Sequence, residues 1–358
     1  MNAGERAALW QSLSDSGLVT GECPATGPEP SPWYVRTMVG VAGWIAAAFL
    51  LGFLGLALTF ITRNGPAAIG VGMLLCAAAI MMLRTSSSQE FLAQFALAAS
   101  LAGQALVVTG LFEALPNRTP AVFIIIAVFE AALAMLASYS VHRTWSAFAA
   151  ALAIFLALHE WRATPLFPGL AALAFAALQA AETRLVARAS LWRATSAGVA
   201  LALLAMVPAA SLLDVSWLSG QAHPGRTGTG TVTGTVLMGL VLTGAVVVLL
   251  RGAGVGLSSR VGITALVSAP VLVAAAWPMP GVIAGTVVAL CAFAVGRYAV
   301  TALGLVIAVA ALSYYYYSLD VPLMTKALSL LAAGGVLIAV RYMLRSWVAQ
   351  KESEVRHA

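Results

Sequence analysis

Long runs of apolar residues, separated by short polar breaks, fill the chain from Thr37 to Trp347. A helix needs about 20 mostly apolar residues to cross a bilayer, and such runs recur along this chain. The pattern predicts an all-α, polytopic transmembrane helix bundle of about twelve spans. The predicted spans are 37–62, 65–83, 91–113, 120–140, 144–160, 164–181, 194–213, 230–250, 261–277, 281–296, 298–316 and 322–344.

The composition of the chain also indicates that this bundle is surrounded by lipid. Hydrophobic residues make up 61% of the 358 residues and charged residues only 9%, with a mean hydropathy of +0.95. So few charges cannot cover the surface of a water-soluble protein of this size. Cys23, Cys76 and Cys291 lie far apart, so the sequence offers no disulfide framework and no paired cysteines for a metal.

The basic residues predict how the bundle is oriented. The net charge is +6, but the lysines and arginines are scattered between spans, which speaks against nucleic-acid binding. Cytoplasmic loops are enriched in lysine and arginine, and a cytoplasmic N-terminus puts 14 of the 19 on the inner side. Twelve spans then leave both termini in the cytoplasm and five basic residues outside: Arg63, Arg118, Arg162, Arg226 and Lys326.

We divide the chain into five parts. A short helix over residues 2–16 ends near Gly17 and continues into a Pro/Gly-rich linker. The segments LHEWRATP and YSLDVPLMTK each place an acid, a proline and a base after a span, which suggests two six-helix halves. The parts are 1–36 (cytoplasmic cap and linker), 37–181 (first half), 182–193 (basic cytoplasmic loop), 194–347 (second half) and 348–358 (cytoplasmic tail).

Glu130 is an acid in the middle of the predicted span 120–140. The helix is expected to start at Thr119 and Pro120, which places Glu130 about 15 Å along its axis, near the bilayer midplane. An acid at that depth costs about 2.5–3.5 kcal/mol to insert, so such residues face the bundle and often mark a pathway.

Two interpretations of Glu130 are open. In the first, Glu130 is protonated at rest and titrates in a proton-linked or cation-linked step, on a candidate path shared with Gln104. In the second, its protonated carboxyl only bonds a neighbouring hydroxyl or Gln104 inside the bundle. The small neighbours Ala127, Ala131 and Ala134 favour contact with another helix over contact with lipid.

A second candidate site is predicted at the outer face. Tyrosines are typical of the membrane interface, and four precede Asp320, which is placed to cap the last span. Lys326 lies further into that span than a boundary requires. The candidate polar residues, which could equally be ordinary solvated helix ends, are His159, Glu160, Arg162, Asp320 and Lys326.

No metal or hydrolytic motif accompanies these residues. The sequence lacks HExxH and a CxxC pair, so we expect no metal site, assign no catalytic residue and expect no cofactor. Gly230/Gly234 and Gly281/Gly285 form GxxxG pairs, which predict close helix packing.

Two segments carry a resemblance to a known family. PWYVRTMVGVAGWIAAAFLLGFLG (32–55) and SYYYYSLDVPLMTKALSLLAAGGVLIAVRY (313–342) resemble the bacterial multipass family termed domain of unknown function 4401. The resemblance implies a Gram-negative inner-membrane protein and a membrane-anchored partner that bears a GDYxxLxY motif. It implies no activity and no catalytic residue, and the oligomeric state stays open.

The leading functional hypothesis is a transporter-like or partner-binding membrane component, proton-linked through Glu130. The alternative is a membrane-embedded transferase or hydrolase that acts on a lipid-linked substrate at the outer face, with His159, Glu160 or Asp320 as acid or base. A transporter requires a cavity that reaches Glu130, whereas the enzyme requires outer carboxylates that converge.

Overall fold

The computed structural model describes residues 3–17, 19–21, 64–85, 90–116, 119–212, 229–277 and 279–318, with isolated residues between 34 and 52 and between 324 and 338. Every regular element in these residues is a helix, as predicted. The α-helices are α1 (Ala3–Asp15), α4 (Gly65–Thr85), α5 (Glu90–Ala114), α6 (Thr119–Leu136), α7 (Ser140–Glu160), α8 (Phe167–Arg184), α9 (Ala189–Leu212), α11 (Thr229–Gly252), α12 (Arg260–Ala275), α13 (Pro280–Ala294) and α14 (Tyr298–Ser318); η1 (Thr164–Leu166) and η2 (Val186–Arg188) are short 3-10 helices.

Eight of the described helices are long and apolar enough to cross a membrane, namely α4 to α9, α11 and α14. The helices α12 and α13 are apolar but shorter, with 16 and 15 residues. The chain is therefore an all-helical membrane protein. The predicted spans 37–62 and 322–344 lie almost wholly outside the described residues, so the number of twelve stays a prediction.

Local residue chemistry explains several helix ends. Ser259 caps α12, because its hydroxyl oxygen accepts a hydrogen bond from the Gly262 amide at 3.0 Å. Gly17 follows α1 and has a φ of 68°, a left-handed conformation that glycine adopts without strain. The predicted cap helix and its end near Gly17 are thus confirmed.

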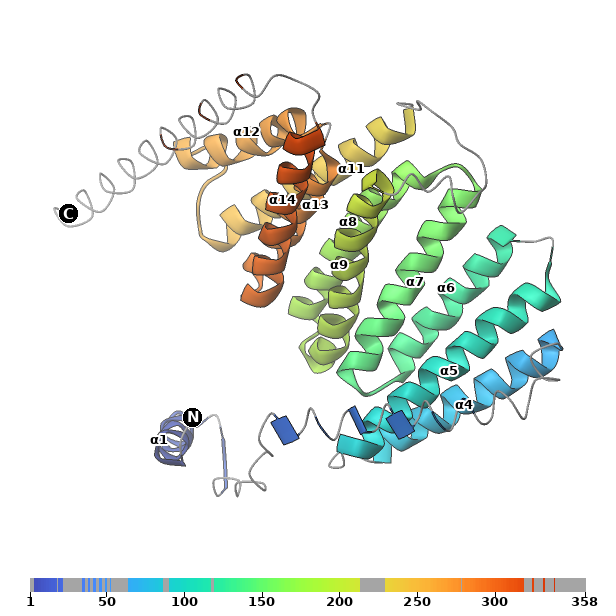
Figure 1. The fold of residues 1–358 in the computed structure, drawn as a ribbon. Helices are drawn as coiled ribbons and strands as arrows, with labels where there is room; N and C mark the ends of the chain where they lie inside the picture. Colours follow the sequence, from blue (N-terminus) through green and yellow to red (C-terminus); the bar gives the residue numbers. More distant parts are fainter. Residues whose placement is uncertain are drawn as a thin grey trace.

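Neighbouring helices pack as pairs joined by short turns. The closest pairs are α4 with α5, α6 with α7, α8 with α9, and α13 with α14. Figure 1 shows α4 to α7 following one another in chain order, with α8 and α9 next and α11, α13 and α14 beyond them. α7 also packs closely on α9 and thereby joins α4 to α7 to the remaining described helices.

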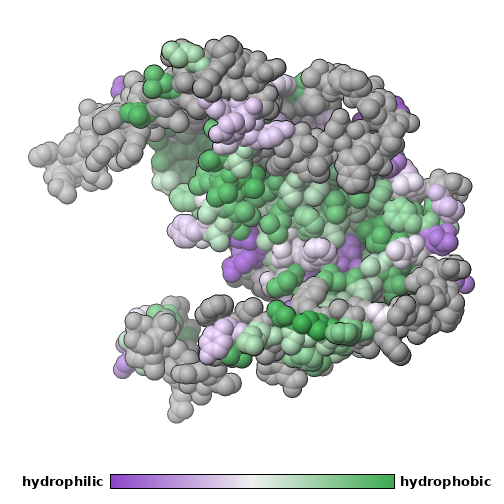
Figure 2. Space-filling view, viewed as in Figure 1, coloured by the Kyte–Doolittle hydropathy of each residue, from purple (hydrophilic) through white to green (hydrophobic). Residues whose placement is uncertain are grey.

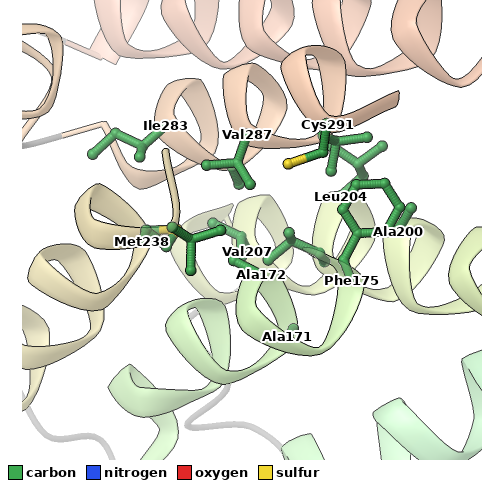
Figure 3. Close-up of a cluster of buried hydrophobic side chains, with 14 of the residues drawn as sticks. Ala171, Ala172, Phe175, Ala200, Leu204, Val207, Met238, Ile283, Val287 and Cys291 are labelled. Atoms are coloured by element: carbon green, nitrogen blue, oxygen red, sulfur yellow. The ribbon is translucent and has the colours of Figure 1, made fainter. Parts of the chain in front are cut away.

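The largest buried cluster joins α8, α9, α11 and α13 (Figure 3). Phe175 of α8 is fully buried there, together with Leu203 of α9 and Val287 of α13. This cluster draws residues from both sides of the turn at 182–193, so that turn lies inside one packed body. The division into two six-helix halves stays a prediction, because it also depends on the first and last spans.

Glycines bring the backbones of α4 and α5 into contact. A Cβ atom on Gly72 would lie 2.6 Å from the Gly103 carbonyl oxygen, and one on Gly103 would lie 2.7 Å from the Gly72 carbonyl oxygen. Gly65 and Gly110 repeat this reciprocal arrangement at 2.8 Å. Small residues allow such close approach, and close packing replaces the hydrophobic effect as the force that joins helices in lipid.

One glycine of each predicted GxxxG pair, Gly234 or Gly285, lies at a tight backbone contact. Gly285 of α13 faces Gly304 of α14, where a Cβ on Gly285 would lie 2.6 Å from the Gly304 carbonyl oxygen. Gly234 of α11 lies against the carbonyl of Pro165 in η1. Both contacts confirm the packing role predicted for these glycines.

The outer surface of the described bundle is apolar. Leu74 of α4, Val248 of α11 and Val306 of α14 are all more than 60% exposed. Figure 2 shows hydrophobic residues over most of the described surface on the visible face. Exposed apolar patches of this extent are suited to lipid tails and not to water.

Several basic turns meet at one end of the bundle. Arg84, at the end of α4, donates to the Leu136 carbonyl oxygen at 2.9 Å. Arg297, before α14, donates to Ser196 of α9 at 2.6 Å, and Thr144 of α7 donates to the Ala194 carbonyl oxygen at 3.1 Å. These bonds place the end of α4 and the α6–α7, α8–α9 and α13–α14 turns at the same end of the bundle.

The glycine contact between α4 and α5 gives a stability prediction. We expect Gly72→Ala to destabilise the protein by about 1–3 kcal/mol, because the new methyl group overpacks a backbone contact. Gly70→Ala on the same helix is the matched control, since nothing lies within 4 Å of a Cβ there. Thermal unfolding in detergent measures both, and an equal effect of the two changes contradicts the packing role of Gly72.

Candidate functional site

The described part of the chain buries Glu130 inside the bundle. Glu130 is only 2% exposed. Its neighbours Ala127 and Ala134 are also buried, whereas Ala131 is exposed. The helix starts at Thr119 as expected but ends at Leu136. Glu130 therefore lies about 16 Å from the start of α6 and about 9 Å from its end, two-thirds of the way along and not at its middle.

Glu130 and Gln104 line one cavity, which lies between α5, α6 and α7 and has a volume of about 320 Å³. The two residues of the candidate path are thus brought together. The other lining residues are apolar or aromatic: Leu101, Ala105, Val108, Phe112, Phe123, Ile126, Trp145, Ala149, Leu152, Ala153 and Leu156.

The cavity is elongated along the helices. On α5 its wall extends from Leu101 to Phe112, about 16 Å along the axis. Glu130, Gln104 and Trp145 line the part nearer the α6–α7 turn, and Phe112 and Phe123 line the part nearer the opposite end. The cavity therefore has one polar end and one apolar end.

A hydrogen-bonded polar network continues from Gln104 between α5 and α7. The Trp145 indole donates to Gln104 Oε1 at 3.1 Å, and Gln104 Nε2 donates to Ser100 Oγ at 3.5 Å. Ser100 Oγ and His142 Nε2 lie 2.6 Å apart. These bonds satisfy buried groups that lipid cannot hydrate.

Three buried polar atoms close to this network have no hydrogen-bond partner among the described residues: Glu130 Oε2, His142 Nδ1 and Ser146 Oγ. Ser146 faces the Glu130 carboxyl from α7, but the geometry gives neither Ser146 Oγ nor Glu130 Oε2 a bond. An unpaired buried polar atom is costly. A proton on the Glu130 carboxyl would remove the charge of this buried group.

The sequence analysis did not single out the other members of this network, although a signal for them exists. Ser100 and Gln104 are four residues apart on α5, and His142, Trp145 and Ser146 are three and four residues apart on α7. Such spacings place polar side chains on one helical face. Polar residues at helical spacing inside apolar spans predict an internal network.

The outer-face candidates are only partly described. His159 Nδ1 and Thr164 Oγ1 lie 3.4 Å apart, and Glu160 and Arg162 are exposed. Asp320 and Lys326 lie outside the described residues. Within the residues that the structure describes, no three of His, Cys, Asp and Glu come together as metal ligands.

A charged cluster that the sequence analysis missed ties α8, α9 and the α13–α14 turn together. Glu182 is 8% exposed and accepts a bond from Arg193 Nε at 2.8 Å, and Arg297 NH1 lies 3.8 Å from the same carboxylate. Burial lowers the pKa of Arg297, and the Glu182 carboxylate opposes that shift. The guanidinium thus stays charged and holds three segments at one end of the bundle.

Fold and site together define the class: an all-helical membrane protein with a buried acid beside a partly open cavity between helices. The chain belongs to the family described as Domain of unknown function (DUF4401), which matches residues 32–346. This confirms the resemblance on which the sequence analysis relied. Neither the comparison with curated proteins nor that with solved structures gave a match.

The charged cluster predicts the effect of removing its acid. We expect Glu182→Ala to destabilise the protein by about 1–3 kcal/mol, because it leaves the largely buried Arg297 guanidinium without its countercharge. Adding Arg297→Met should recover part of that loss, because the largely buried guanidinium is removed as well. Thermal unfolding in detergent is the measurement, and Glu160→Ala, which changes an exposed acid, is the control.

Proposed function

We propose that the protein is a transporter-like membrane component that binds a ligand in the cavity between α5, α6 and α7 and couples this to protonation of Glu130. One observation carries the proposal. Glu130 is 2% exposed, lines the cavity and keeps an oxygen without a hydrogen bond. Acids buried in transmembrane bundles are rare and commonly belong to substrate or proton pathways.

The surroundings of Glu130 support a ligand site over simple helix packing. A buried carboxyl that serves packing alone would have its oxygens satisfied by neighbouring donors. Here the nearby amide of Gln104 is engaged with Ser100 and Trp145. The carboxyl instead borders a space large enough for a small molecule.

The enzymatic alternative has no specific observation in its favour among the described residues. His159 is near Thr164, while Glu160 is exposed. The acid that is buried beside a cavity is Glu130, which lies away from this end of α7. We therefore keep the transporter-like proposal as the single one.

The proposal includes a location and an orientation. About twelve spans with both termini in the cytoplasm of a bacterial inner membrane fit the lysine and arginine distribution. The basic turns that meet at one end of the bundle support the cytoplasmic assignment of that end. A membrane-anchored protein with a GDYxxLxY motif is the proposed partner.

Cysteine labelling tests the orientation. In a Cys23→Ser background, Glu160→Cys should react with a membrane-impermeant maleimide added to cells with a permeabilised outer membrane. Ala187→Cys, in the turn between α8 and α9, should react only after the inner membrane is opened. Both positions are exposed, and the native Cys76 and Cys291 are buried. Labelling of both from the same side contradicts the proposed topology.

A titration of Glu130 tests the proton-linked step. Infrared difference spectra of the reconstituted protein should contain a protonated carboxyl band that weakens as the pH rises, since deprotonation removes it. The band should be absent in Glu130→Gln and unchanged in Glu160→Gln, which alters an exposed acid. A Glu130 carboxyl that stays in one protonation state over the whole range contradicts the proposal.

The same variants test the biological role. In cells that lack the gene, Glu130→Gln should fail to restore the wild-type phenotype, while Glu160→Gln should restore it. Full complementation by Glu130→Gln at every external pH rules out the proton-linked function.

A further inference from the structure

Among the described residues, the lining of the cavity beside Glu130 contains one acid and no base. Gln104 is the other strongly polar residue of the lining, and its carbonyl oxygen already accepts a bond from Trp145. Its amide nitrogen already donates to Ser100. Glu130 is therefore the ionisable residue of the described lining.

An ionised carboxylate is an acceptor without donors, so it selects a cation or a strong donor. In an apolar surrounding the carboxylate is poorly solvated, and it needs either a proton or a positive partner. The part of the lining that the structure describes contains no arginine or lysine that could supply that partner. A ligand cation and a proton are thus two alternative ways to neutralise the same group.

The groups around Glu130 do not replace such a partner. On α4, Cys76 lies within electrostatic range of Glu130, but its thiol donates to the Ser100 carbonyl at 3.5 Å. On α5, Ser100 and Gln104 are neutral. On α7, Ser146 is neutral, and His142 is engaged with Ser100.

The rest of the cavity fits an apolar body attached to that positive charge. Phe112 and Phe123 meet edge to face at the far end, with ring centroids 5.5 Å apart. Trp145 lies at the polar end, where an indole ring can also attract a cation. The volume of about 320 Å³ lies at the small end of ligand sites, which span about 300–1,000 Å³.

We propose that the cavity binds a lipophilic organic cation, an amine or quaternary ammonium with an apolar body, whose positive charge pairs with Glu130 in exchange for its proton. This rests on the proposed function and adds the ligand class. The exchange balances, because protonated Glu130 releases one proton to water and the resulting carboxylate forms an ion pair with one cation. The apolar body lies toward Phe112 and Phe123.

The test uses two probes of nearly equal shape, phenyltrimethylammonium and its neutral isostere tert-butylbenzene. The full-length protein is placed in lipid nanodiscs, and empty nanodiscs are measured in parallel to correct for partition into lipid. Binding is followed by the shift in thermal unfolding temperature, and proton release is followed with a pH dye in weak buffer. The variants are Glu130→Gln, Ala149→Phe, which fills the cavity and leaves the acid, and Glu160→Gln as control.

The proposal expects the cation to stabilise the wild-type protein and to release protons. As the pH is lowered through the range in which Glu130 is protonated, the affinity for the cation should fall about tenfold per pH unit, because one proton competes with one cation. Glu130→Gln should weaken cation binding at least about tenfold, and Ala149→Phe should weaken it while Glu160→Gln does not. The pH competition in the wild type gives an answer even if a variant fails to fold.

Two results overturn the proposal. In the first, tert-butylbenzene stabilises the protein as much as the cation does, and neither pH nor Glu130→Gln changes cation binding. The cavity is then an apolar site for neutral molecules or lipid tails. The other is no cation binding in wild-type protein whose Glu130 does titrate in the infrared experiment. That second result rejects the ligand class and leaves the proposed function intact, whereas a Glu130 that never titrates rejects the proposed function itself.

Discussion

The absence of hydrogen-bond partners in lipid is the constraint on which this structure depends. It requires the backbone to form helices, and it requires polar side chains in these helices to find partners within the protein. Thr109, Thr243 and Thr286 do so by donating to carbonyl oxygens three or four residues earlier in their own helices. Ser100, His142, Gln104 and Trp145 do so between helices.

Glu130 is one of the exceptions to that rule among the described residues, together with Gln179 and one oxygen of Glu182, and it is the one of these that lines the cavity. Its neighbours are either already bonded or, like Ser146, without a bond of their own. Glu182 differs, because its carboxylate is paired with Arg193 and lies near Arg297 at the basic end, although its Oε2 also lacks a hydrogen bond. Glu182 thus has countercharges inside the fold, whereas the described lining of the cavity gives Glu130 none.

Periodicity and length predicted much of this fold. The apolar runs located α4 to α9, because each run is long enough to be a helix and is interrupted by polar or glycine-rich turns. Glu130 and Gln104 could be paired because both are polar residues inside apolar spans. Their common cavity, however, depends on how α5 packs against α6 and α7, and a single sequence does not specify helix neighbours.

The same limit explains what was missed. Glu182 was hidden among the residues of a basic turn, since its pairing with Arg297 joins residues more than a hundred positions apart. The end of the helix that carries Glu130 was also misplaced, because α6 ends at Leu136 and not near residue 140. At that end Arg84 donates to the Leu136 carbonyl oxygen and Arg143 to the Ala137 carbonyl oxygen, contacts that no local pattern reveals.

The reciprocal glycine contacts between α4 and α5 have a mechanical consequence. Two backbones in direct contact resist sliding, and the side chains at the contact, such as Val107 and Cys76, are themselves tightly packed. The boundary of this pair with α6 consists instead of side-chain contacts and the bond from Arg84 to the Leu136 carbonyl oxygen. We therefore expect a movement of α4 and α5 to occur as one unit at that boundary and to change the width of the space beside Glu130.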